Sequence, residues 1–312
     1  MTAVMAGLLV LIVPSAALAQ TTATLADLLP LLSLGGVRIG DAPAPSSSSE
    51  VPASDRGSST DAARAPQPGQ GEGQKVYTAE EATDPIPLNS QFNFQPTYQR
   101  RSGGRNNSYV TLKPRLVVQE PLPLLVRFDW DVPRVDNENG PTIAGIGDLQ
   151  WTTLFLINPR PGPWGKLGIG PVFVFPTASH KEMGDGKYEI GPALGYVNLD
   201  VKGWQFALLV QQFFSFAGDS RRSTVNQLSL QYFIHKYLPD SWYIGTQPTI
   251  TVNFEKDTSS VPLQLVVGKV FGGRWNVNLQ ATAFPHWTSK PTTDYQFTLS
   301  IGYQFPALFS RQ

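Results

Sequence analysis

The chain has 312 residues, and its 24 basic and 24 acidic residues cancel to a formal charge of +0. This balance gives no electrostatic case for binding nucleic acid. The absence of cysteine excludes disulfides, thiolate metal sites and a cysteine nucleophile. Charged residues make up 15% of the chain and aromatic residues 11%, a composition compatible with a surface that faces lipid.

The first segment of the chain has the features of a secretory signal peptide. An apolar run from Met5 to Val13 is followed by Ala17-Leu18-Ala19, which fits the small-x-small pattern of a signal peptidase site. We therefore expect residues 1–19 to be removed by cleavage before Gln20. The run is far shorter than the ~20 residues that a spanning helix needs. No Lys or Arg precedes it, and a buried core helix is the alternative interpretation.

Residues 20–86 are predicted to form a disordered periplasmic segment. From Ala42 to Pro85 the chain is rich in Ser, Pro, Gly and Gln. Such a composition cannot bury enough apolar surface to offset the entropy of ordering the chain. A leucine-rich patch at residues 25–34 is either a brief helix that plugs a barrel or a marginal amphipathic turn with no role, and we favour the turn.

From Pro87 onward, apolar and polar residues alternate with a period of two. In the segment 294–305, for example, Phe297 and Leu299 alternate with Thr298 and Ser300. Strand side chains switch faces at every residue, so each such segment has one apolar and one polar face. The segments run to roughly 10 residues and carry aromatic residues at their ends, as strands that cross an outer membrane do. A soluble β-protein is the alternative.

This pattern predicts an all-β fold, an antiparallel transmembrane β-barrel of about 12 strands over residues 87–312. The expected strands are 90–99, 108–119, 122–133, 144–157, 166–175, 187–199, 203–215, 224–237, 241–254, 261–270, 274–284 and 294–305. Tight turns alternate with longer polar loops, as in bacterial barrels whose short turns face the periplasm. No stretch after residue 19 is apolar for long enough to span as a helix, so a closed barrel in the cell outer membrane is the expected form.

The same alternation directs charged and amide side chains into the barrel. The candidate lumen-lining residues are Lys113, Arg115, Arg127, Asp129, Asp131, Asp148, Glu189, Gln231, Gln247 and Gln280. A tight turn at Pro121 would place Lys113 opposite Asp129 and Arg115 opposite Arg127. An Arg or Lys on the lipid face would cost about 2–4 kcal/mol at the bilayer midplane, so this register is well specified. The charges are either a patch that contacts substrate or ions, or ion pairs that brace the lumen, which we favour.

Residues for catalysis or for binding a cofactor or metal are not evident. The three histidines, His180, His235 and His286, fall near different ends of the predicted strands and cannot easily form a zinc site. His286 with Ser289 is a poor match to the Ser-His-Asn set of an outer-membrane phospholipase. We therefore expect no enzyme, cofactor or metal; the expected partners are outer-membrane lipid, a small-molecule substrate and the barrel-assembly machinery. An outer-membrane hydrolase ranks third among the functions considered.

A set of short motifs between Gly145 and Phe305 resembles a known family. The motifs, in chain order, are Gly145-Ile-Gly-Asp148, Leu167-Gly-Ile-Gly-Pro-Val-Phe-Val-Phe-Pro-Thr177, Ile190-Gly-Pro-Ala-Leu-Gly-Tyr196, Asn226-Gln-Leu-Ser-Leu-Gln-Tyr232, Trp242-Tyr-Ile244 with Gln247-Pro-Thr-Ile-Thr251, Gly268-Lys-Val-Phe271 and Asn276-Val-Asn-Leu-Gln280. They resemble the outer-membrane transporter family of the phenol-degradation meta-pathway (MetA-pathway type). The resemblance implies passage of small, hydrophobic or aromatic molecules and no catalytic residues. A non-transporting structural or surface-interaction barrel is the alternative.

Overall fold

A computed structural model of this protein describes residues 76–101, 106–135, 141–158, 165–285 and 293–308. The predicted signal peptide, residues 20–75 and His286 lie outside these ranges. Within them, none of the helices is long and apolar enough to cross a membrane.

One antiparallel sheet contains the strands of the described part of the chain. The strands are β1 (Ser90–Arg101), β2 (Asn106–Val118), β3 (Leu124–Val135), β4 (Ile143–Ala144), β5 (Leu149–Leu156), β6 (Lys166–Phe175), β7 (Lys187–Asn198), β8 (Trp204–Gly218), β9 (Asn226–Tyr237), β10 (Trp242–Thr246), β11 (Thr249–Asn253), β12 (Thr258–Ser260), β13 (Leu263–Phe271), β14 (Trp275–Ala283) and β15 (Thr293–Phe305). The helices are α1 (Ala79–Thr83) and the 3-10 turn η2 (Pro239–Ser241).

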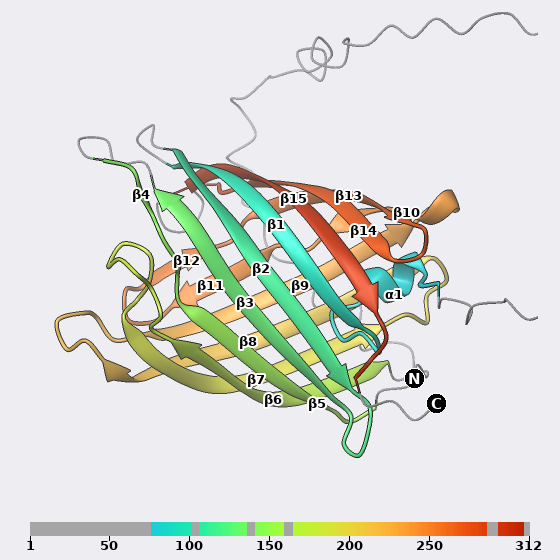
Figure 1. Ribbon diagram of the computed structural model, residues 1–312, viewed down its shortest axis with the longest axis horizontal. Coiled ribbons are helices and arrows are strands. Elements are labelled where there is room, and N and C mark those ends of the chain that lie inside the picture. The colour runs from blue at the N-terminus through green and yellow to red at the C-terminus, as the bar shows by residue number, and fades with distance from the viewer. Residues whose placement is uncertain (1–75, 102–105, 136–140, 159–164, 286–292, 309–312) are drawn as a thin grey trace, which may run out of the picture. The chain divides into compact units, whose positions relative to one another are not determined.

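The sheet closes on itself, and twelve wall strands result. β15 pairs with β1 from Ser90–Phe305 to Arg101–Thr293, so the two strands that lie farthest apart in sequence lie side by side (Figure 1). β10 and β11 are two pieces of one wall strand, because both pair with β9. β4 and β12 are short extensions at loop ends, paired with β3 and β11. The predicted all-β barrel of about 12 strands is therefore confirmed.

Two predicted strands are interrupted. The segment 241–254 breaks at Gln247–Pro248, because proline has no N–H for the ladder. Only its first half, β10, pairs with β13; across the seam beyond it, the backbone N–H of Gln247 donates to Oε1 of Gln264 (3.2 Å). The segment 144–157 is irregular between Ala144 and Leu149, where the backbone N–H groups of Gly145 and Gly147 still donate to the carbonyls of Pro133 (3.2 Å) and Asp131 (2.8 Å) of β3.

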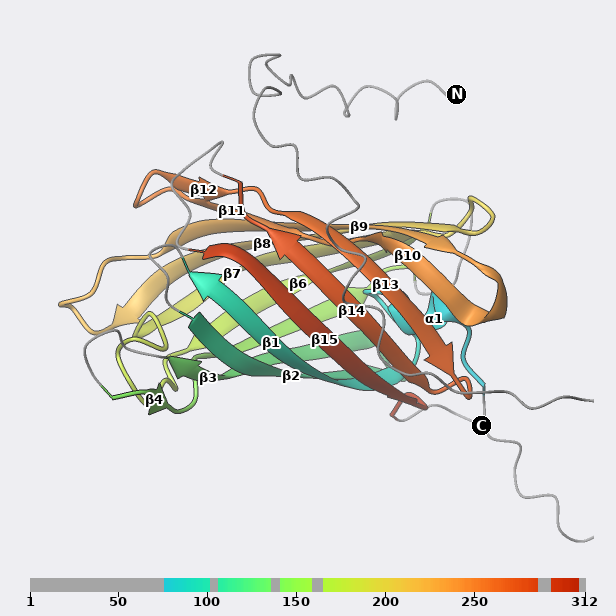
Figure 2. The ribbon, with the colours of Figure 1, turned by 90° about the horizontal axis from the view of Figure 1, so that it is seen from above.

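The predicted boundary at residue 87 lies too late, because residues 77–86 are ordered inside the barrel. This stretch, here called the inserted segment, contains α1, whose start is fixed by a capping box between Thr78 and Glu81. Tyr77 and Ile86 are among the most deeply buried side chains of the described chain. A composition averaged over 42–85 hides these apolar residues, so the prediction of disorder is wrong for the inserted segment. Figure 2 shows α1 at the end of the barrel where β10, β13 and β14 meet their short turns.

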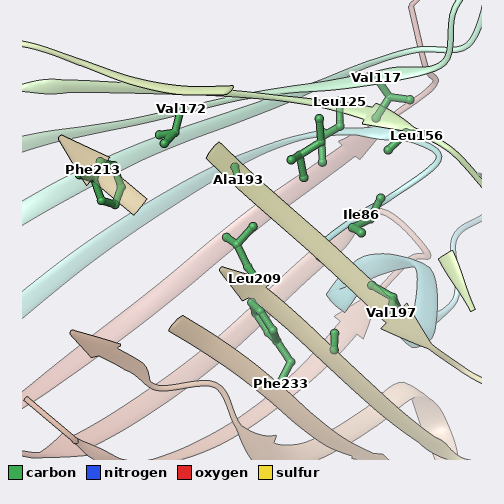
Figure 3. Packing of buried hydrophobic residues seen from close by; sticks show 12 residues of the cluster. Ile86, Val117, Leu125, Leu156, Val172, Ala193, Val197, Leu209, Phe213 and Phe233 are labelled. Carbon is green, nitrogen blue, oxygen red and sulfur yellow. The ribbon is translucent and has the colours of Figure 1, made fainter. Parts of the chain in front are cut away.

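An apolar cluster fills part of the interior toward the short-turn end. Its members are Ile86, Val117, Leu125, Leu154, Leu156, Val172, Ala193, Val197, Ala207, Leu209, Phe213 and Phe233. Ile86 of the inserted segment lies among side chains from the walls, as Figure 3 shows. The apolar residues of this barrel therefore face two ways, toward lipid on the outside and toward this cluster on the inside.

The two faces of β14 provide a direct test of the side-chain orientation. Leu279 is 64% exposed on the outer face, whereas its neighbour Gln280 is 8% exposed and faces the interior. We expect Leu279→Arg to destabilise the barrel by about 2–4 kcal/mol, because the charge would lie in hydrocarbon. Gln280→Arg should cost clearly less. Urea unfolding of the protein folded into lipid bilayers measures both; equal costs at the two positions would contradict the assignment of faces.

Candidate functional site

The interior holds a polar cavity of about 300 Å³ along the wall formed by β13, β14, β15, β1 and β2. Amide and hydroxyl side chains dominate its lining, including Gln264, Gln280 and Ser300. At one end the cavity reaches Phe284 beside the long loops, and at the other it reaches Thr83 of the inserted segment. The cavity therefore extends along most of the barrel's length.

The charged residues that line the polar cavity are all basic. They are Lys113, Arg115 and Arg127, and no Asp or Glu is among the residues that line it. Arg115 and Arg127 lie directly opposite each other on β2 and β3, as the sequence predicted. The charged side chains that line the polar cavity are therefore all positive, with Asp129 and Asp131 next to this lining.

A second cavity of about 300 Å³, the acidic cavity, lies at the long-loop end of the β3–β9 wall. The charged residues that line it are all carboxylates, namely Asp129, Asp131, Asp148, Asp185 and Glu189. Polar and apolar side chains complete the lining, and one of the apolar ones, Phe213, also belongs to the apolar cluster below. The two cavities therefore have opposite signs.

Asp129 lies at the border between the two cavities, because it lines the acidic cavity and contacts two basic residues of the polar cavity. Its carboxylate lies 3.5 Å from Nζ of Lys113 and 3.9 Å from Nη2 of Arg127. The predicted pairing of Lys113 with Asp129 is therefore present. This row of charges across β2 and β3 separates the basic from the acidic part of the lumen.

The other carboxylates of the acidic cavity have different environments. Asp131 accepts a hydrogen bond from Oγ1 of Thr111 (2.5 Å). Asp148 accepts from the backbone N–H groups of Ala178 (3.1 Å) and Asp185 (2.7 Å), which ties the loop before β7 over the cavity. Glu189 is only 4% exposed, and Asp148 and Asp185 act on it electrostatically.

Each of the ten predicted lumen residues lines one of these two cavities. Lys113, Arg115, Arg127, Gln231, Gln247 and Gln280 line the polar cavity, and Asp129, Asp131, Asp148 and Glu189 line the acidic one. Sequence reasoning missed Asp185, because a loop residue has no periodicity that would reveal its direction. It also missed Ala82 and Thr83, which line the polar cavity from the inserted segment.

Polar contacts hold the inserted segment at the short-turn end. Asp84 forms a buried ion pair with Lys166 of β6. Oγ1 of Thr83 lies 2.7 Å from the hydroxyl of Tyr237, and Nδ2 of Asn276 donates to the carbonyl of Ala82 (3.1 Å). The inserted segment therefore narrows the lumen at this end.

A larger hollow, of about 770 Å³, lies on the outer surface of the barrel. Leu265, Leu279 and Phe297 line it, and all three are exposed residues of the lipid-facing side. Its walls are therefore those of the membrane-facing surface rather than of the lumen.

Metal chemistry has no visible basis in the described ranges. There, no group of three His, Cys, Asp or Glu side chains could hold a metal ion. His235 lies in the interior, where Nδ1 is 2.9 Å from Oε1 of Gln205. The hydrogen-bond partner of Nδ1 of His235 is therefore a side-chain amide, not a hydroxyl group that could act as a nucleophile.

Comparison with known proteins shows the fold. No family model matches the chain, and no curated protein matches it in sequence. An outer membrane channel from Pseudomonas putida F1 is similar in structure, with a TM-score of 0.55 and 12% identity, covering 74% of this chain and 100% of that one. The NanC porin has a TM-score of 0.51 and 10% identity, covering 69% and 100%.

The chain has the fold of outer-membrane β-barrel channels. Both similar proteins are channels or porins rather than enzymes. The predicted outer-membrane barrel is thereby confirmed at the level of the fold, whereas the resemblance to the MetA-pathway family stays a prediction.

The contact between Lys113 and Asp129 can be measured by a double-mutant cycle. We expect Lys113→Ala and Asp129→Ala each to destabilise the barrel, and the two together to cost less than the sum, with a coupling of roughly 0.5–3 kcal/mol. Either single change leaves the other charge without its main partner. As a control, Lys113→Ala combined with Glu255→Ala, in the exposed turn before β12, should be additive. Additivity of Lys113→Ala with Asp129→Ala would show that the two side chains do not interact.

Proposed function

We propose that the protein is an outer-membrane conduit for small molecules. The polar cavity carries this proposal, because it follows one wall of the barrel from Phe284 at the long-loop end to Thr83 at the short-turn end. A barrel with a purely structural role would have no need of a polar cavity along its interior.

The dimensions favour a selective conduit over a general porin. A barrel of about eight strands is filled by side chains, and one of sixteen leaves a wide aqueous channel, so twelve lies between. Each cavity has about 300 Å³, the lower end of the range for small-molecule sites. The apolar cluster narrows the remaining space. Solutes of about one ring in size would therefore pass singly.

We further propose that the solutes are small hydrophobic or aromatic compounds, as the resemblance to the MetA-pathway family implies. The lining of the polar cavity supports this, because Tyr109, Phe233, Tyr243 and Phe284 provide aromatic surfaces between its amides. An aromatic solute would contact these rings, while polar groups would orient it.

A non-transporting structural or surface-interaction barrel is the second candidate. The observation in its favour is the inserted segment, which together with the apolar cluster occupies the short-turn end. Passage through the lumen would require this segment to move. The buried ion pair between Asp84 and Lys166 is the contact to weaken, since both side chains are 4% exposed.

We expect Asp84→Ala to raise single-channel conductance and the rate of liposome swelling in small aromatic solutes. The change leaves the charge of Lys166 buried without its partner, at a cost of roughly 3–5 kcal/mol, which loosens the inserted segment. Combining Asp84→Ala with Lys166→Met should restore much of the seal, because no buried charge remains.

Asp200→Ala, in the exposed turn between β7 and β8, removes a carboxylate elsewhere at the short-turn end and should leave conductance unchanged. A barrel that stays sealed to ions and aromatic solutes in the wild type and in Asp84→Ala, in a strain with no uptake defect, would refute transport. The structural candidate would then hold.

A further inference from the structure

Two arginine side chains in the polar cavity have buried N–H groups without hydrogen-bond partners. Arg127 is 5% exposed, and its Nε and Nη1 atoms have no hydrogen-bond partner. The Nε of Arg115 also has none. Because the two residues are in register on adjacent strands, two guanidinium groups face the same part of the cavity.

This arrangement is costly in the absence of an anion. An arginine cannot shed its charge at accessible pH. A buried guanidinium with unsatisfied N–H groups carries a desolvation penalty. Asp129, whose carboxylate lies 3.9 Å from Nη2 of Arg127, is shared with Lys113, so it does not neutralise the arginine pair by itself.

We propose that Arg115 and Arg127 bind the carboxylate of a small aromatic acid in the polar cavity. The guanidinium fork matches a carboxylate through two parallel hydrogen bonds, and charge-assisted bonds of this kind are about twice as strong as neutral ones. The proposal builds on the proposed function, because it names the class of solute for one of the two cavities.

The lining of the polar cavity bears on the rest of the ligand. Phe233 lines this cavity and belongs to the apolar cluster, so the cavity offers an apolar surface to a ring attached to the carboxylate. A volume of about 300 Å³ limits the ligand to roughly one ring. The carboxylates of the acidic cavity repel an anion, which leaves the wall of β13, β14, β15 and β1 as its path from the long-loop end.

The test is the binding of benzoate to the purified full-length mature protein in detergent, measured by isothermal titration calorimetry. We expect saturable binding at one site, and no measurable binding of benzamide, which has the same shape without the charge. Arg115→Gln and Arg127→Gln should each weaken benzoate about tenfold or more, the loss expected when one charged hydrogen-bonding partner is removed. Arg221→Gln, an exposed arginine paired with Asp219 outside the lumen, is the matched control and should bind as the wild type does.

A second measurement separates loss of the site from loss of the fold. Because Arg115 and Arg127 repel each other, Arg115→Gln should leave the melting temperature of the free protein unchanged or higher while benzoate binding falls. Benzoate binding that is absent, that survives both glutamine variants, or that is matched by benzamide would overturn the proposal. Sulfate binding as tightly as benzoate would overturn the aromatic-acid assignment and leave a general oxyanion site.

This experiment does not depend on transport. Benzoate bound by the arginine pair in a protein that never conducts would uphold the inference and refute the conduit. Passage of neutral aromatic solutes without benzoate binding would uphold the conduit and refute the inference.

Discussion

The pairing of β15 with β1 is the constraint on which the rest of the structure depends. In hydrocarbon every backbone N–H and C=O must be satisfied by the protein itself, so a spanning sheet must close. Along most of the wall the ladder meets this requirement; at the seam beyond β10, the side chain of Gln264 accepts the backbone N–H of Gln247. Closure also divides the residues of each strand into those facing lipid and those facing the interior. The polar and charged lumen therefore follows from the same constraint that lets the chain reside in a membrane.

The interior is heterogeneous, and its parts have different origins. On the β13–β2 side amides line a polar cavity whose charged groups are basic, while on the β3–β9 side apolar residues close the space beneath a cavity of carboxylates. Asp129 stands at the border and pairs with cations of the neighbouring cavity. A solute entering from the long-loop end thus meets fields of opposite sign on the two sides of the lumen. In the proposed conduit, this separation would provide selectivity by charge.

Strand period and charge placement made much of this architecture predictable. The register that sets Lys113 opposite Asp129 followed from the rule that charges avoid lipid, and the structure has that pairing. The break at Pro248 follows from the missing N–H of proline. The prediction of one continuous strand relied on the alternation of apolar and polar residues and gave no weight to this local signal. The inserted segment was not predictable from composition, because its few apolar residues are buried only by contact with the barrel walls that surround Ile86. Asp185 reaches the acidic cavity through hydrogen bonds of a loop, which no sequence period encodes.

The central claim is that a water-accessible polar path, whose charged residues are basic, follows the β13–β2 wall inside the barrel. Since the chain has no cysteine, single cysteines placed on this wall report the path without interference. The most direct measurement is the rate at which thiosulfonate reagents modify Gln280→Cys and Gln296→Cys in membranes, with Leu279→Cys on the lipid face as the reference. The account predicts rapid modification at the two lumen positions, faster with an anionic than with a cationic reagent of similar size, and little reaction at Leu279→Cys. Lumen cysteines as unreactive as the lipid-facing one, or faster with the cationic reagent, would contradict it.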